Sequence, residues 1–165
     1  MPALFENIKP MYGWIQKKNI LIILGWSALI SFLAIKSFWL FYLQNVKFYN
    51  LRITFRYGEG PGFTEIDAIL IIAMSFLVSM LYADAKKLVW TYVTSIALSF
   101  VAIATYIFYY MWYVLDYASP LCLTPFGWEE ILLLAIMNAL RFMFPWGVFI
   151  SLIGLITGSF LKSHF

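Results

Sequence analysis

Few side chains in this chain of 165 residues could carry out acid–base or metal chemistry. It has one histidine, His164, next to its last residue, and one cysteine, Cys122. A bis-histidine haem site, a two-histidine zinc site and a serine hydrolase all need at least one imidazole at the depth of the site. A single thiol forms neither an intrachain disulfide nor a thiolate cluster. We therefore identify no catalytic, cofactor-binding or metal-ligating residue, and we expect no cofactor or metal to be bound by this chain alone.

Lys36 is the first candidate for a functional contact, because it interrupts a long apolar run. A charge at membrane depth is costly and is by default a functional candidate. Lys36 lies about 16 residues into its expected helix, roughly 24 Å along the axis. This places it close to the far interface, where a lysine can extend its ammonium group to water. A partner or lipid contact and an ordinary interfacial lysine both remain open.

Glu130, Asn138 and Arg141 form the second candidate, the only polar stripe in an otherwise apolar segment. Asn138 and Arg141 are three residues apart, and Glu130 precedes Arg141 by eleven, so all three are expected on one side of a helix. One interpretation is a contact to an acid on another helix or subunit. The other is an interfacial helix whose polar side faces water.

Arg52 and Arg56 belong to the third candidate, residues 50–57, where polar and apolar side chains alternate strictly. This period indicates a half-buried β-strand, and the glycines and proline of residues 58–62 end it. The chain offers no obvious partner strand. Because an isolated strand leaves its backbone groups unpaired, another chain could complete it.

Long apolar stretches must position these side chains. The composition is 64% hydrophobic, 21% aromatic and 12% charged, far from that of a soluble domain. Each stretch is at or near the roughly 17–25 residues that a helix needs to cross a bilayer. We expect spans at about 20–43, 66–83, 88–115 and 144–161, with extramembrane loops at 44–65 and 116–127. The predicted fold is an all-α integral membrane protein, a single transmembrane domain over residues 1–165 with four spanning helices.

The last helical region is predicted to be long and kinked. Residues 128–161 would extend roughly 51 Å as one helix, about 20 Å more than the hydrocarbon core. The run Pro145-Trp146-Gly147 should kink or break it. Residues 128–143 would then tilt, lie in the interface or pack against a partner. A five-span arrangement is the weaker alternative.

Local signals bound the second helix and suggest its contacts. Thr64 and Asp67 resemble a capping box, so this helix should start near Thr64, with Glu65 also favoured in its first turn. The short link at 84–87 predicts that the second and third helices are antiparallel neighbours. Small residues on these helices allow close approach in lipid; they include Ser75, Ser79, Ser95, Ser99 and several alanines. Gly154 and Gly158 form a Gly-x-x-x-Gly pair in the last span.

Cation placement suggests an orientation. With four spans, six cations lie on the side of the termini and five on the other. Those near the termini sit closer to helix ends, so the positive-inside rule places both termini in the cytoplasm or its organellar equivalent. The aromatic residues of the far side are typical of an interfacial belt. The net charge of +3 comes from scattered residues, so no nucleic-acid partner is expected.

Two functions fit this sequence. The first is a non-catalytic structural or assembly subunit of a larger membrane complex, of respiratory, oxidase or translocation type, with other membrane subunits and lipids as partners. The alternative is a small homo-oligomeric transporter or channel. A lipid-acting enzyme is a third possibility, but no acid–base constellation supports it. The chain alone is therefore not expected to be an enzyme, although its complex could be one.

Overall fold

The structure is a computed structural model that describes residues 17–46, 63–82, 84–114 and 127–164. These residues are helical apart from short connections and helix ends. The helices are α3 (Lys17–Val46), α4 (Glu65–Leu81), α5 (Ala85–Tyr109), the π-helix η1 (Tyr110–Val114), α6 (Trp128–Met143) and α7 (Trp146–His164). The predicted all-α class is confirmed for the described part of the chain. The predicted strand at 50–57 lies outside it.

Three segments of the described chain are long and apolar enough to cross a membrane: Asn19–Leu40, Ala85–Val114 and Trp128–His164. Their outer faces carry large apolar side chains such as Leu21, Val101 and Ile156, which suits contact with lipid. These features are consistent with a multi-pass integral membrane protein. The remaining predicted span is the second along the chain, at 66–83; it corresponds to α4, which has 17 residues.

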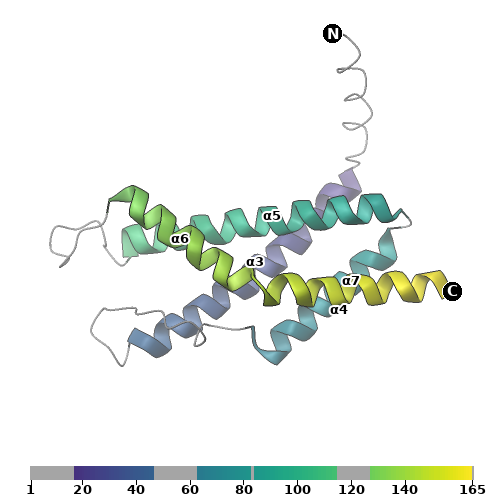
Figure 1. The fold of residues 1–165 in the computed structure, drawn as a ribbon, viewed down its shortest axis with the longest axis horizontal. Helices are drawn as coiled ribbons and strands as arrows, with labels where there is room; N and C mark the ends of the chain where they lie inside the picture. Colours follow the sequence, from purple (N-terminus) through teal and green to yellow (C-terminus); the bar gives the residue numbers. More distant parts are fainter. Residues whose placement is uncertain (1–16, 47–62, 83, 115–126, 165) are drawn as a thin grey trace, which may run out of the picture.

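The helices run in alternating directions along one long axis (Figure 1). α3 and α5 run one way, whereas α4 and then α6 with α7 run the other way. The last region breaks where the proline predicted it: α6 ends at Met143 and α7 begins at Trp146. The segment at 128–143 packs against α5 and η1, and it buries Ile131, Ala135 and Ala139.

The neighbours of α4 differ from the prediction. α4 and α5 are antiparallel, as the short link requires (Figure 1), but they do not pack along each other; α4 packs chiefly on α7, and α5 packs on α3 and α6. A short link determines the relative direction of two helices, whereas the side chains on their surfaces determine which helices pack together. Here the small residues decide, because Ser75 and Ser79 of α4 meet Gly154 and Gly158 of α7.

The contact between α4 and α7 is close enough that these two positions require glycine. A Cβ atom at Gly154 would lie 2.5 Å from the carbonyl oxygen of Ile72, and one at Gly158 would lie 2.9 Å from that of Phe76. Ser79 Oγ and Ser159 Oγ form a hydrogen bond of 2.8 Å across the same contact. The Gly-x-x-x-Gly pair is therefore a helix contact, and it joins two parallel helices within one chain.

Aromatic rings fill the core between α3, α5 and α6. Phe38 makes edge-on contacts with Tyr110 and Phe142, at centroid distances of 5.5 and 5.7 Å. All three rings are buried. Trp39 donates a hydrogen bond from Nε1 to the Tyr106 hydroxyl. Part of the aromatic density expected at the interface is therefore packed inside the bundle, although Tyr109 and Tyr113 remain exposed.

Candidate functional site

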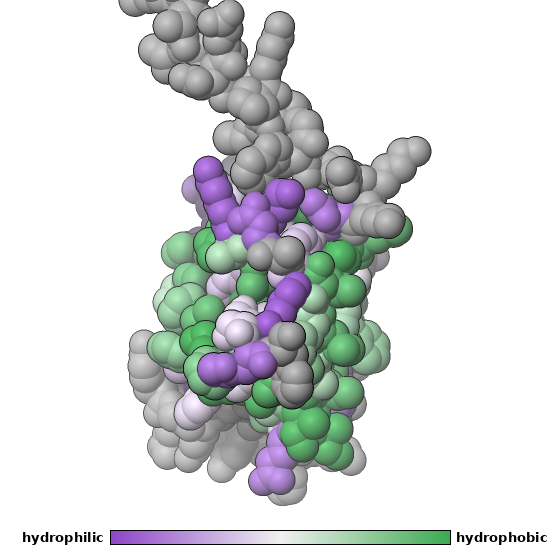
Figure 2. Space-filling view, turned by 90° about the vertical axis from the view of Figure 1, so that its right-hand side faces the viewer, coloured by the Kyte–Doolittle hydropathy of each residue, from purple (hydrophilic) through white to green (hydrophobic). Residues whose placement is uncertain are grey.

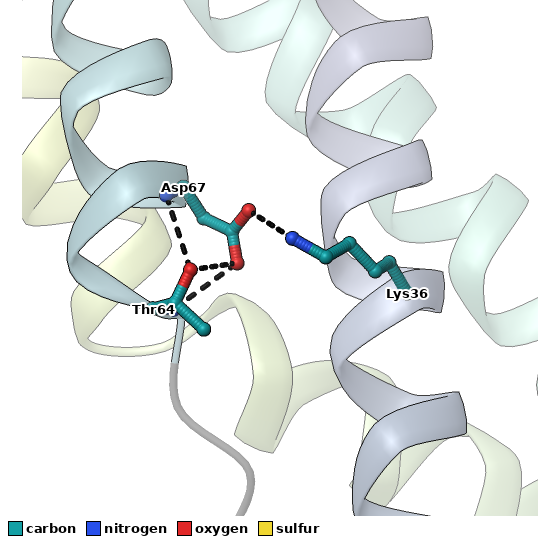
Figure 3. Close-up of polar contacts among 3 residues, drawn as sticks. All are labelled: Lys36, Thr64 and Asp67. Atoms are coloured by element: carbon teal, nitrogen blue, oxygen red, sulfur yellow. Dashed lines mark hydrogen bonds and ion pairs between the residues drawn. The ribbon is translucent and has the colours of Figure 1, made fainter.

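Asp67 and Lys36 form an ion pair between α4 and α3. Lys36 Nζ lies 2.8 Å from Asp67 Oδ1. The Asp67 side chain is 1% exposed and that of Lys36 is 40% exposed. The lysine therefore extends from α3 to a buried carboxylate on α4 (Figure 3).

Thr64 donates hydrogen bonds to the second carboxylate oxygen of Asp67. Its backbone N–H and its hydroxyl donate to Asp67 Oδ2, over 3.1 and 2.7 Å. In return, the Asp67 N–H donates to Thr64 Oγ1 over 3.3 Å. This is the capping box predicted from the sequence, and α4 does begin at Glu65, directly after Thr64. The cap holds the carboxylate in one orientation, with Oδ1 directed at Lys36 (Figure 3).

The break between α6 and α7 lies beside this first turn of α4. Phe63 precedes Thr64, and its ring packs on Gly147, where an added Cβ atom would lie 3.1 Å from the ring. Phe144 N–H donates to the Leu140 carbonyl, and Phe149 N–H donates to the Pro145 carbonyl. These bonds end α6 and start α7. The ion pair, the cap and the helix break thus meet at one end of α4.

The other candidate residues are placed separately. Glu130 is exposed and accepts a hydrogen bond from Gly127 N–H over 3.2 Å, which caps the start of α6. Asn138 is buried, and its Nδ2 donates to the Leu134 carbonyl over 2.8 Å. Arg141 is half-buried. A role of the three as one partner-facing stripe stays a prediction.

Arg52 and Arg56 lie outside the described residues, so their predicted partner contact stays a prediction. Within the described part of the chain, no group of three or more His, Cys, Asp or Glu side chains is placed to hold a metal ion.

Sequence reasoning missed two contacts. Asp67 was expected to cap α4, and Lys36 to lie near the interface, but their pairing was not anticipated. Lys36 was expected near the end of one span and Asp67 at the start of the next, so both were expected near the same membrane face. This shared position was the available signal for their pairing. The second contact is at Tyr92, whose hydroxyl donates to the Val148 carbonyl over 3.2 Å and lies 3.4 Å from Ser151 Oγ. No motif indicated that contact.

Lys162 makes a further contact at the opposite end of α4. Its Nζ donates to the carbonyl oxygens of Met80 and Tyr82, over 3.0 Å each. A cation is favourable there because the last carbonyls of a helix lack partners within it. Both ends of α4 are thus held by lysines from neighbouring helices.

Comparison of the chain with protein-family models, curated proteins and solved structures found no match. The function is therefore proposed from the chain's own residues.

Proposed function

We propose that this chain is a non-catalytic structural or assembly subunit of a larger membrane complex, of respiratory, oxidase or translocation type. The observation that carries the proposal is that both carboxylate oxygens of Asp67, a fully buried acid, are bonded within the chain. Its Oδ1 is paired with Lys36, and its Oδ2 accepts two hydrogen bonds from Thr64. A carboxylate occupied in this way fixes helices, whereas a general base needs an accessible lone pair.

The topology proposed for this subunit has four spans. In this topology α4 also crosses the membrane, since 17 residues extend about 26 Å, close to the hydrocarbon thickness. Its outer face carries the exposed residues Ile69, Leu70 and Leu77, which suits lipid.

Both termini of this subunit would lie in the cytoplasm. Figure 2 shows hydrophilic residues gathered at the end of the bundle where α7 ends and α5 begins. Lys86, Lys87 and Lys162 belong to this end. The helices that start at the opposite end, α4 and α6, carry acids in their first turns. A cationic end is expected on the cytoplasmic side.

Arg141, with Asn138 beside it on α6, is the proposed contact to another subunit or to a lipid phosphate. A guanidinium can form paired hydrogen bonds to a carboxylate or phosphate, which suits an assembly contact. Replacing Arg141 by Leu should therefore lower the yield of complex and leave the activity per assembled complex unchanged. Arg141→Lys is the matched control; it keeps the charge but not the fork of donors, so an intermediate yield is expected.

The test of this proposal is gentle extraction of the native particle, followed by mass analysis. Unlike membrane subunits that co-purify in fixed ratio would support it. A stable, active monomer would rule it out. Normal assembly of the Arg141→Leu protein with lost activity would point to a transport or catalytic role.

A small homo-oligomeric transporter or channel is the second candidate, and one observation favours it. The break between α6 and α7 lies next to the Lys36–Asp67 pair through Phe63 and Gly147. Interrupted helices beside buried charges line the substrate sites of many transporters. Mass analysis separates the two candidates, because this one requires copies of the same chain only.

A further inference from the structure

The helices form two groups that differ in how tightly they pack. The first is the α4–α7 pair, joined along its length by backbone contacts at Gly154 and Gly158. The second is the three-helix group of α3, α5 and α6, joined by its aromatic core. Close backbone approach between the groups is limited mainly to α3 against α4 and to the junction of α6 with α7. Side chains of both groups nevertheless share one buried cluster, in which Val78 of α4 and Leu155 of α7 lie with Trp26 and Ile30 of α3.

An ion pair and hydrogen bonds cross between the groups in the described part of the chain. At the start of α4, Lys36 pairs with Asp67. Further along, Tyr92 of α5 bonds to Val148 and Ser151 of α7. In contrast, Ser79–Ser159 and the two bonds of Lys162 lie inside the α4–α7 pair. The boundary thus combines these polar contacts with side-chain packing, whereas close backbone contact joins the α4–α7 pair.

Two short connections join the groups in the described chain. One is the turn at Phe144-Pro145 between α6 and α7, where the helical hydrogen bonds are interrupted. The other is the link between α4 and α5, from Tyr82 to Asp84. The start of α4, which carries Asp67, lies at the far end of α4 from that second link (Figure 1). A tilt of the pair about the link between α4 and α5 would displace the start of α4 most, and with it Asp67 and the adjoining turn at Phe144-Pro145.

We propose that the α4–α7 pair moves as one unit relative to the three-helix group, and that the Lys36–Asp67 ion pair is the latch that holds the closed position. Tightly packed units that turn on a few residues at element ends are a common form of conformational change. The latch suits this role because Lys36 is half-exposed and can leave, whereas Thr64 keeps Asp67 in place on α4. The proposal is independent of whether the protein works in a complex.

Distances between spin labels on the full-length chain in lipid nanodiscs test this motion. The background carries Cys122→Ser. Labels at Ile66→Cys on α4 and Ala102→Cys on α5 report across the boundary, and both positions are exposed. Labels at Ile66→Cys with Ile153→Cys report within the α4–α7 pair. Labels at Phe32→Cys with Ala102→Cys report within the three-helix group.

Lys36→Met should shift or broaden the 66–102 distance by about 2 Å or more, the size of typical helix displacements, and leave the other two distances unchanged. Lys36→Arg should retain the original 66–102 distance, because it keeps the charge. An unchanged 66–102 distance in Lys36→Met would overturn the proposal, and so would equal broadening of all three distances. If Lys36→Met does not fold, Lys36→Gln takes its place with the same expected and contradicting outcomes.

Discussion

The Lys36–Asp67 pair combines two roles in one carboxylate. Asp67 caps its own helix through Thr64 and ties that helix to α3 through Lys36. A buried charge without its partner is strongly unfavourable, whereas the pair itself contributes modestly to stability. The effect of a substitution therefore depends on which partner is removed.

Lys36→Met should destabilise the protein by about 1–3 kcal/mol. The effect is smaller than that for a fully buried pair because Lys36 is half-exposed. The physical reason is the uncompensated charge left on Asp67. Adding Asp67→Asn to Lys36→Met should recover part of this loss, since the double variant buries no unpaired charge. The measurement is reversible unfolding in mixed micelles, arranged as a double-mutant cycle. Additive losses would show that the two residues are not coupled.

Thr64→Val should cost about 1 kcal/mol, the usual value for a lost N-cap. Hydrogen exchange should increase in the first turn of α4, where the Asp67 N–H loses its acceptor. Thr94→Val is a matched control. The Thr94 hydroxyl only bonds back to the Trp90 carbonyl within an exposed helical turn, so little change is expected. Equal effects of both substitutions would argue against the cap.

At the scale of elements, side-chain size determines which helices become neighbours. The α4–α7 contact depends on serines facing glycines, which lets two backbones approach. The contacts of α3 and α5 combine serines with aromatic rings. Ser99 Oγ donates to the Ser27 carbonyl over 3.2 Å, and Trp26 packs on Tyr92 at 5.7 Å. Hydrophobicity suits all of these helices to a membrane, whereas the shape of their side-chain surfaces determines which helices pack together.

Gly154→Ala should destabilise the protein by about 1–3 kcal/mol, because its methyl group would overlap the Ile72 backbone and force α7 away from α4. Gly25→Ala is the matched control. A Cβ atom at Gly25 meets nothing within 4 Å, so a gain of about 0.5–1 kcal/mol is expected from helix propensity. Unfolding of the two variants in the same micelles is the measurement. Equal stability of both would contradict the close contact.

At the scale of the whole molecule, charge separates the two ends. Lysines lie where α5 begins and α7 ends, and acids lie in the first turns of α4 and α6. In the proposed orientation the lysine-bearing end faces the cytoplasm, as the positive-inside rule expects.

Cysteines introduced at positions 5 and 163 should both react with an impermeant thiol reagent from the cytoplasmic side only. The reason is that four spans return the chain to its starting side. The measurement is labelling of intact and inverted vesicles in a Cys122→Ser background. Reaction of the two ends from opposite sides would require an odd number of spans, with residues 128–143 crossing separately.

The local features of this protein followed from its sequence. Apolar runs determined the membrane class, Thr64 and Asp67 the start of α4, and Pro145 the break before α7. Each depends on residues that are neighbours along the chain, so a single sequence contains the whole signal.

Tertiary structure alone decided the partners of the helices. Lys36 and Asp67 are 31 residues apart, and Ser79 and Ser159 are 80 apart. Several pairings of the same apolar helices satisfy hydrophobicity equally well. The short link even favoured α5 as the neighbour of α4. Close packing instead pairs α4 with α7, because the glycines of α7 allow the serines of α4 to approach its backbone. In this arrangement Asp67 lies within hydrogen-bond distance of Lys36.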